Sequence, residues 1–355
     1  MFSSPRSDGV INADRVGLRA KSARELGDSE SRRAAAALVF CLLLMLAPAA
    51  SFACACGCGV FDVGTVTMLS SHPGGMVYLE DDYQSQDQNW VGSHAGPASA
   101  NTDKEIQTNF GGVGSVYQFN SDWGAELKIP YWDRLFRTDI GAPGAPDVVT
   151  YRHSALGDIH LQARYTGLSS AEQSTGITFG LKLPTGDWTY PNFDRDTSIG
   201  TGTTDLLLGA YHLGNVGSGN LGGLGRLQWF AEFLLDRAFN TREEYRPGNE
   251  MDAALGVIYS GIQVTPSVTA SPLLQVIVSD RLHDSGANAD PANSGYERLL
   301  ISPGLEVNVA RWTLYVDAEI RTIHYANAAA SVAAEGTQGQ LVAPVLIKAM
   351  VSYNF

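Results

Sequence analysis

The sequence predicts an all-β fold: a transmembrane antiparallel β-barrel of 12 strands with short periplasmic turns and longer extracellular loops. Three observations predict it. The end of the chain alternates apolar and other residues with the period of a strand. Segments of the same kind recur back to residue 74. The connections between them are alternately short and long, a sorting that a transmembrane barrel shows and a soluble sandwich does not need.

The C-terminal segment 340–355 shows the clearest alternation. One face holds apolar residues at every second position from Leu341 to Phe355, and the other face carries Lys348 among mixed residues. An apolar face of this length suits a strand that crosses a bilayer and contacts outer-membrane lipid. Tyr353 followed by the final Phe355 resembles the C-terminal signature of bacterial outer-membrane barrels. The resemblance implies a bacterial outer-membrane location and insertion by the barrel-assembly machinery through the Phe355 strand.

Eleven further segments show the same period and are bounded by clusters of Gly, Pro, Asn and Asp. In 311–324, for example, Trp312 and Leu314 alternate with Tyr315 and Asp317. In hydrocarbon every backbone N–H and C=O must be paired within the protein, so the strands have to close into a barrel. The predicted strands are 74–84, 107–119, 123–132, 155–166, 176–184, 203–213, 225–236, 250–260, 268–281, 296–309, 311–324 and 340–355.

The connections follow the order of the strands. Those after even-numbered strands are mostly short, as at 120–122, whereas those after odd-numbered strands are longer, as at 85–106, 133–154 and 185–202. An even strand number with this sorting predicts a barrel with both ends in the periplasm.

The part before the barrel is predicted to be removed or periplasmic. The apolar run 34–50 follows Arg32 and Arg33 and ends in small residues, the pattern of a secretory signal peptide. A single membrane anchor is the alternative interpretation. The predicted organisation is a leader and signal peptide over 1–53, a Cys-rich periplasmic segment over 54–73, and the barrel over 74–355.

Composition excludes some classes of protein. The chain has 24 Lys and Arg against 37 Asp and Glu, a formal net charge of -13, and nothing in it predicts nucleic-acid binding. Its mean hydropathy of -0.06 and its single long apolar run argue against a helical membrane protein.

Charged residues on the inward face of the predicted strands are the candidate lumen residues. Acids and bases occur in equal number, which predicts a mixed interior without strong ion selectivity. Two readings stay open: the charges pair across neighbouring strands, or some of them line a water-filled passage. The candidates are Glu126, Lys128, Asp158, His160, Arg164, Lys182, Asp205, Arg226, Glu232, Asp236, Arg298, Glu306, Arg311, Asp317, Glu319, Arg321 and Lys348.

Three short motifs follow one another in the middle of the chain: Leu-Gly-Asp-Ile at 156–159, Leu-Pro-Thr-Gly-Asp at 183–187 and Gly-Thr-Gly-Thr-Thr-Asp at 200–205. Physically they punctuate strands, because Pro184 ends ladder pairing and glycines permit turns. In this order they resemble the outer-membrane β-barrel transporter family associated with phenol degradation by meta-cleavage. The resemblance spans roughly residues 110–355 and implies a porin-like channel for small solutes, with aromatic or hydrophobic compounds as the substrate class.

The N-terminal cysteines depart from that pattern. Cys54, Cys56 and Cys58 lie within five residues, and closely spaced thiolates can hold a soft metal ion such as Cu(I) or Zn(II). A disulfide with one thiol left over and a lipid anchor on Cys54 remain open as alternatives. A second hypothesis for function follows, in which the barrel anchors this metal-binding segment or serves as scaffold for a periplasmic partner.

Nothing in the sequence predicts an enzyme. A barrel phospholipase needs a His and a Ser on the outer face near the external rim. Here strict alternation points His324 outward, while Ser352 on the next strand faces inward at the opposite end. No Gly-x-Ser-x-Gly, His-Glu-x-x-His or Walker motif is present, so no catalytic residue is predicted.

Overall fold

The computed structural model describes residues 74–142, 145–170, 173–216, 226–327 and 339–355. The predicted leader 1–53 and the three N-terminal cysteines lie outside these ranges. None of the helices in the described ranges is long and apolar enough to cross a bilayer.

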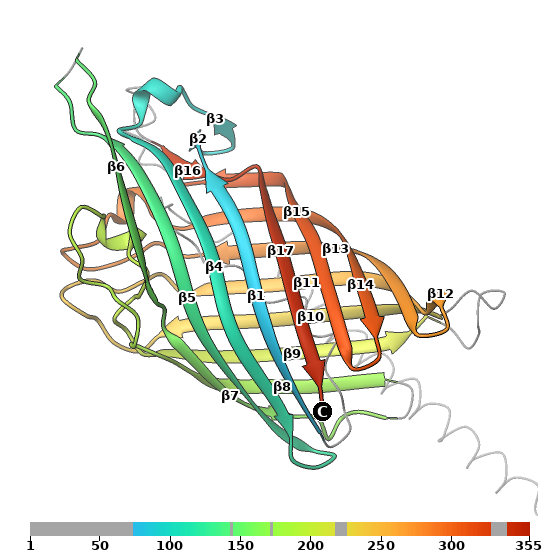
Figure 1. The fold of residues 1–355 in the computed structure, drawn as a ribbon. Coiled ribbons are helices and arrows are strands. Elements are labelled where there is room, and N and C mark those ends of the chain that lie inside the picture. Colours follow the sequence, from blue (N-terminus) through green and yellow to red (C-terminus); the bar gives the residue numbers. More distant parts are fainter. Residues whose placement is uncertain (1–73, 143–144, 171–172, 217–225, 328–338) are drawn as a thin grey trace, which may run out of the picture. The chain divides into compact units, whose positions relative to one another are not determined.

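The chain forms a closed antiparallel barrel of 12 strands, which confirms the predicted fold class (Figure 1). β6 and β7 together make one wall strand, interrupted at residues 157–158. Each wall strand pairs with its neighbour in sequence, and β1 pairs with β17 to close the wall. The wall strands are β1 (Gly74–Gln86), β4 (Asp103–Gln118), β5 (Trp123–Asp139), β6 (Val148–Leu156), β7 (Ile159–Tyr165), β8 (Gln173–Leu183), β9 (Asp205–Asn215), β10 (Arg226–Ala238), β11 (Glu250–Ser260), β13 (Val268–Arg281), β14 (Tyr296–Val309), β15 (Trp312–Ala326) and β17 (Val345–Asn354).

Short elements lie at the two ends of the barrel. β12 (Ile262–Thr265) forms a hairpin with the start of β13 at the periplasmic end. At the extracellular end β2 (Gln88–Val91) pairs with β3 (His94–Ala95) and with β16 (Gln340–Val342). Within the described residues, three short 3₁₀ helices lie in the extracellular loops, at Ala98–Ala100, Arg195–Thr197 and Pro291–Asn293.

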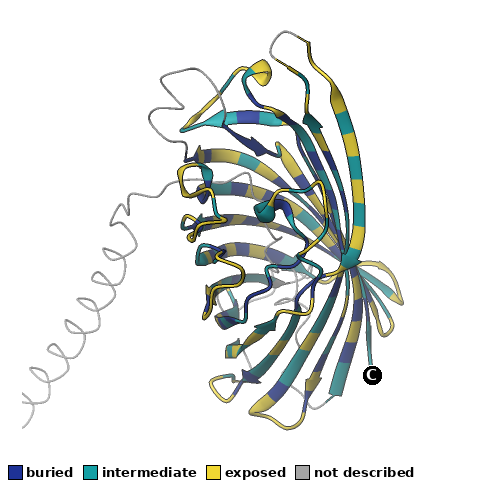
Figure 2. Cartoon of the chain, turned by 90° about the vertical axis from the view of Figure 1, so that its left-hand side faces the viewer, coloured by how far each residue is buried: buried dark blue, intermediate teal, exposed yellow. Residues whose placement is uncertain are grey.

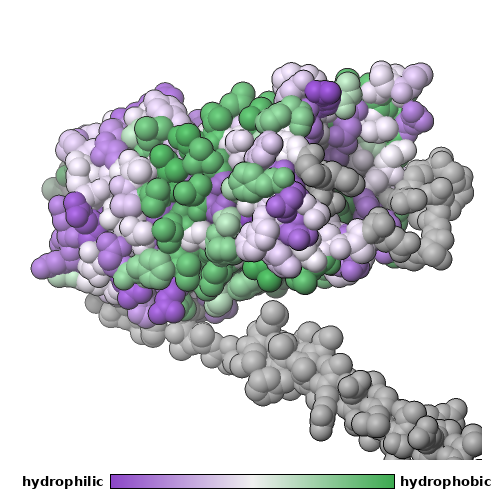
Figure 3. Space-filling model, turned by 90° about the horizontal axis from the view of Figure 1, so that it is seen from below, coloured by the Kyte–Doolittle hydropathy of each residue, from purple (hydrophilic) through white to green (hydrophobic). Residues whose placement is uncertain are grey.

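The outer surface of the wall is apolar. Leu79, Leu161, Leu255, Leu274 and Ile320 all point outward and are exposed, Leu255 at 60%. Buried and exposed residues alternate along the strands in Figure 2, and hydrophobic residues gather around the middle of the face shown in Figure 3. Alternation with an apolar outer band is the pattern of a barrel that contacts lipid.

The seam between the first and last strands is held by the last residue. The Phe355 N–H donates to the Gly75 carbonyl at 2.8 Å, and the Gly75 N–H donates to the Phe355 carbonyl at 3.0 Å. A Cβ added to Gly75 would lie 2.3 Å from the Phe355 ring, so glycine is needed there for packing. Insertion through the Phe355 strand by the assembly machinery stays a prediction.

The predicted strand 340–355 is wrong at its start. Pro344 interrupts it, because proline has no N–H to donate to the ladder, and β16 leaves the wall to pair with β2. Leu341 was expected to face outward. It is buried instead, in a small cluster with Ile106 and Phe136.

The predicted orientation of His324 is also wrong. Leu299 pairs with Ile323 but Leu300 pairs with Arg321, so one extra residue, Thr322, bulges out of β15. A bulge shifts the alternation by one residue. Ile323 is therefore outward and 61% exposed, whereas His324 faces inward and is 8% exposed.

The interior is less polar than the sequence analysis implied. Buried apolar side chains from β1, β4, β9, β10, β11, β13, β14, β15 and β17 meet inside the barrel, which we call the apolar cluster. Most of them lie on the periplasmic half of their strands. The cluster consists of Met76, Tyr78, Val116, Tyr211, Phe230, Ala254, Ile258, Leu273, Ile277, Leu300, Tyr315 and Met350.

Candidate functional site

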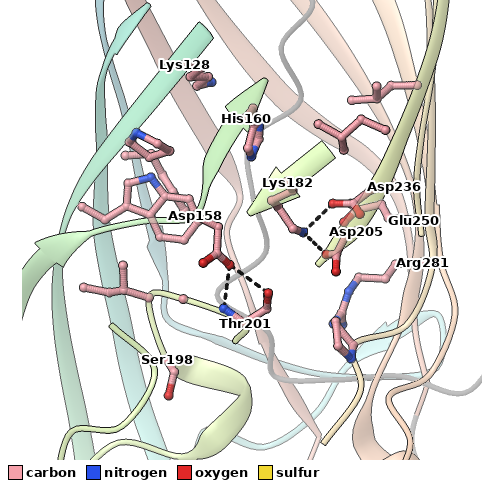
Figure 4. Close-up of a pocket in the computed structure, with 18 of the residues that line it drawn as sticks. Lys128, Asp158, His160, Lys182, Ser198, Thr201, Asp205, Asp236, Glu250 and Arg281 are labelled. Atoms are coloured by element: carbon pink, nitrogen blue, oxygen red, sulfur yellow. Dashed lines mark hydrogen bonds and ion pairs between the residues drawn. The ribbon is translucent and has the colours of Figure 1, made fainter. Parts of the chain in front are cut away.

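A cavity of about 190 Å³ lies inside the barrel, toward the extracellular ends of the strands. Its walls come from inward side chains of the barrel and from two extracellular loops, 184–204 and 239–249. Figure 4 shows the charged side chains that point into it from several strands. We treat this cavity as the candidate functional site because it combines a partly open space inside the barrel with many polar groups.

Asp158 fixes one wall of the cavity. It lies at the break between β6 and β7 and is almost completely buried. Its Oδ1 accepts a hydrogen bond from the Gly186 N–H at 2.9 Å, and its Oδ2 accepts two from Thr201, from the N–H and from Oγ1, at 2.8 Å each (Figure 4). One carboxylate thus clamps both ends of loop 184–204 to the wall.

The three sequence motifs therefore meet at one place. The Ile159 N–H donates to Thr185 Oγ1 at 2.9 Å, and the Gly200 N–H donates to the Asp187 carbonyl at 2.8 Å. Gly186 and Gly200 pack backbone to backbone, and a Cβ on Gly186 would lie 2.8 Å from the Gly200 Cα. The motifs hold the loop in place, which is an architectural role of the kind that the sequence analysis expected.

Lys182 lies on β8, which pairs with β7 beside Asp158, and it forms the centre of the adjacent wall of the cavity. Its Nζ lies 2.5 Å from Asp205 Oδ2 and 2.5 Å from Asp236 Oδ2, and Asp205 is 1% exposed (Figure 4). Strand register explains the contacts, because Lys182 pairs with Asp205 across β8 and β9 while Asp236 follows on β10. The ammonium group is thus shared by two carboxylates.

Other predicted lumen bases also form ion pairs across strands. Lys128 Nζ lies 2.6 Å from Glu80 Oε1, and Lys348 Nζ lies 3.7 Å from Asp82 Oδ2. Neither Glu80 nor Asp82 was among the predicted residues, although they alternate with outward Leu79 on β1. Their position on the face opposite Leu79 was the sequence signal that could have identified them.

The remaining predicted residues are spread along the inner wall. His160 lines the cavity, and Glu126 accepts a hydrogen bond from the Tyr78 hydroxyl at 3.3 Å. Arg164 is fully buried and donates to the Tyr211 hydroxyl at 2.9 Å. Toward β15, a second cavity of about 40 Å³ is lined by Arg298, Glu319 and Arg321. Glu232 is half-buried on β10, and Glu306 accepts a hydrogen bond from the Asn308 side chain. Asp317 accepts hydrogen bonds from the side chains of Gln275, Ser302 and Tyr315.

Two predicted lumen residues, Arg311 and Arg226, are not placed in the lumen by the described structure. Arg311 is exposed in the turn between β14 and β15, so its assignment to the lumen is wrong. The predicted strand began one residue too early, at the turn itself. Arg226 pairs with Ser260 in the wall, but its side chain lies outside the described part of the structure.

The cavity is richer in acids than the balanced interior that the sequence predicted. Inward carboxylates from β1 and β11 and one from loop 184–204 were not among the candidates. The loop residue could not be found because loop folding cannot be derived from alternation. Among the described residues, eight carboxylates line the cavity, Glu80, Asp82, Asp158, Asp196, Asp205, Asp236, Glu250 and Asp252, against four bases, Lys128, Lys182, Arg195 and Arg281.

Loop 184–204 supplies a carboxyl group, that of Asp196, whose pKa is raised mainly by burial. Burial raises the pKa of Asp196 well above its ordinary value of 3.8, and the neighbouring carboxylates Asp284, Asp194 and Asp103 raise it further, while Arg281 opposes them. Removing a charge from water disfavours the ionised form, and like charges nearby do the same.

Acidification is expected to stabilise loop 184–204 locally. The pKa of Asp196 is about 3.8 in the unfolded chain and higher in the folded loop. Between these two values the folded loop binds more protons than the unfolded chain, so the stability of the loop falls as the pH rises through this range. Hydrogen exchange of peptides from 184–204, corrected for intrinsic rates, should show stronger protection at about pH 5 than at neutral pH. Asp196→Asn should remove the difference; a variant that keeps it would contradict the assignment.

No metal site or catalytic pair is found in the described ranges. No three His, Cys, Asp or Glu side chains there lie close enough together to hold a metal ion. Metal binding by Cys54, Cys56 and Cys58 stays a prediction, since these residues lie outside those ranges. His324 and Ser352 both face inward, but register places Ser352 beside Thr313 at the other end of β15.

Comparison with known proteins supports the fold. No known protein-family profile matches the chain, and no curated protein matches its sequence. An outer membrane channel from Pseudomonas putida F1 has a similar structure, with a TM-score of 0.54 and 14% identity over 80% of this chain and 96% of that one. The beta domain of the Bordetella autotransporter BrkA gives a TM-score of 0.45 and 11% identity, covering 80% of this chain and 100% of that one.

The closed 12-strand wall, its apolar outer band and the first of these matches define the class: this is a bacterial outer-membrane β-barrel protein.

Proposed function

We propose that the protein is an outer-membrane channel through which small solutes pass. The observation that carries the proposal is the partly open cavity, which lies inside a closed transmembrane wall and is lined by inward polar side chains. The structurally similar Pseudomonas putida protein is itself an outer membrane channel, which supports the same role here.

The apolar cluster supports organic solutes as the cargo. A solute that leaves the cavity toward the periplasm meets side chains such as Tyr78, Phe230 and Met350. A hydrated ion pays a large desolvation cost against such a surface, whereas an aromatic or aliphatic molecule does not. The proposed substrate class is therefore small aromatic or hydrophobic compounds, in agreement with the family resemblance of the three motifs.

Transport assays on purified protein test the proposal. Proteoliposomes should take up phenol or benzyl alcohol faster than empty liposomes, and planar bilayers should show little ion conductance. Met350→Ala, which shortens an inward side chain of the apolar cluster, should raise the ion conductance, while Val351→Ala on the outward face should leave it unchanged. Uptake equal to that of empty liposomes would count against a channel.

A further inference from the structure

We propose that the cavity binds small organic ammonium ions, that is, protonated amines. The inference rests on the proposed function and adds a binding preference, among its organic solutes, for those that carry one positive charge. The binding groups are inward carboxylates of β10 and β11, namely Asp236, Glu250 and Asp252, which we call the acidic wall.

Strand register brings the acidic wall together. Asp236 on β10 pairs directly with Glu250 on β11, and Asp252 follows two residues later on the same inward face. Leu234 pairs with Asp252 and lines the same cavity. A charged strip thus lies next to apolar surface, which is the arrangement that an amine with an organic body requires.

Asp252 carries a carboxylate oxygen that accepts no hydrogen bond from the described part of the chain. The residue is 6% exposed, it lines the cavity, and its Oδ1 atom accepts no hydrogen bond from the described residues. Ser279 on β13 pairs with Asp252 in the strand register, and among nearby charges Glu250 repels the carboxylate and Arg298 attracts it. A buried carboxylate oxygen without a donor is costly, so a ligand N–H that reached it would recover that cost.

The protein's own lysine shows that this part of the cavity accepts an ammonium group. Lys182 Nζ lies 2.5 Å from both Asp205 and Asp236, and both carboxylates come from neighbouring strands of the same wall. Glu250 and Asp252 continue this wall by one strand and form no ion pair with Lys182. These two carboxylates line the same cavity and are not neutralised by Lys182, and Glu250 Oε1 also accepts a hydrogen bond from the Tyr296 hydroxyl.

Charge balance favours a cation. Three of the four bases that line the cavity form ion pairs: Lys182 with two carboxylates, Lys128 with Glu80, and Arg281 with Asp284 at 2.6 Å. The fourth, Arg195, donates a hydrogen bond to the Thr201 carbonyl. Among the described residues that line the cavity, the eight carboxylates are twice as many as the four bases. A cationic solute lowers the repulsion among the excess acids, whereas an anion raises it.

Size favours an organic cation over a metal ion. No three ligating side chains of the described residues are close enough together for one metal ion. A cavity of about 190 Å³ exceeds the roughly 150 Å³ that suffices to hold benzene in an engineered protein. Leu207, Leu234 and Pro247 supply apolar lining for such a ring.

Calorimetry on the purified full barrel in detergent tests the proposal with three probes of one shape: benzylammonium, benzyl alcohol and benzoate. We expect benzylammonium to bind at least about tenfold more tightly than either of the others, since its charged N–H groups form the stronger class of hydrogen bond. Equal affinities for the three probes, or a preference for benzoate, would overturn the proposal.

Variants assign the preference to the acidic wall. Asp252→Asn should reduce it to less than about threefold, and Glu250→Gln should weaken it in the same direction. The matched control is Glu306→Gln, which neutralises another buried inward carboxylate that does not line the cavity and should leave the preference intact. If Asp252→Asn does not fold, as judged by heat-modifiable migration on gels, Glu250→Gln decides; an unchanged preference in that folded variant overturns the proposal.

Binding in detergent is independent of passage through a membrane, so the two proposals fail separately. Selective binding of benzylammonium without uptake into liposomes would support the ammonium site and overturn the channel. Uptake without any preference for benzylammonium would do the reverse.

Discussion

Replacing Asp158 with alanine is expected to lower the free energy of unfolding by about 3–5 kcal/mol, since three hydrogen bonds to a buried carboxylate are lost together. Gly186 and Thr201 would lose the group that clamps both ends of loop 184–204. Because residues of this loop line the cavity, its release should also raise conductance in planar bilayers. Chemical denaturation in lipid vesicles measures the first effect and single-channel recording the second.

Asp187→Ala is the matched control for this change. Asp187 lies in the same loop, but its carboxylate is partly exposed and its partners are the His153 ring at 3.0 Å and the Thr189 N–H at 3.3 Å. Loss of such a pair is worth only about 0–1 kcal/mol. If the two variants were equally stable, the clamp at Asp158 would not be what holds the loop.

Replacing Lys182 with methionine is expected to cost about 3–5 kcal/mol, because it leaves Asp205 and Asp236 next to each other without their shared cation. Methionine keeps most of the side-chain volume, so lost packing contributes little. The added negative charge should also move the reversal potential toward cation selectivity in a salt gradient.

Neutralising the acids tests the cause of that loss. In a triple variant, Lys182→Met with Asp205→Asn and Asp236→Asn, no buried charge is left unpaired, and most of the lost stability should return. Arg311→Met serves as control, because Arg311 is exposed in a turn and should change stability by no more than about 0.5 kcal/mol. A triple variant as unstable as the single one would show that uncompensated charge is not the reason.

The architecture could be predicted from the sequence because two patterns agreed. Alternation marked the strands, and connection lengths told the two ends of the barrel apart. The alternation pattern gave wrong predictions at two places. The bulge at Thr322 shifts which residues of β15 face inward, so that His324 points into the barrel. Pro344 interrupts the last strand, so that β16 pairs with β2 and not with the wall. A bulge of this kind is decided by the fit of neighbouring strands, which one strand's sequence does not reveal.

The site could be predicted only in part. Lys182, Asp205 and Asp236 were found because parity places them inside, and register then brings them together. The inward fold of loop 184–204 was not foreseen, although its motifs were. Its clamp on Asp158 depends on hydrogen bonds between distant segments, and no local pattern encodes those.

The apolar cluster had a sequence signal that was passed over. Tyr315 and Met350 occupy inward positions next to polar ones, Asp317 on β15 and Lys348 on β17. An apolar residue at such a position packs against others of its kind across the barrel, and only the closed wall shows which ones meet.

This cluster also bears on how the cell stays protected. A barrel that held only water would let detergents and antibiotics leak across the envelope. If the protein is the channel proposed above, side chains such as Phe230 and Tyr315 would admit only molecules that lose their hydration water readily. Replacing these side chains with smaller ones should therefore increase the sensitivity of the bacterium to drugs before it prevents the protein from folding.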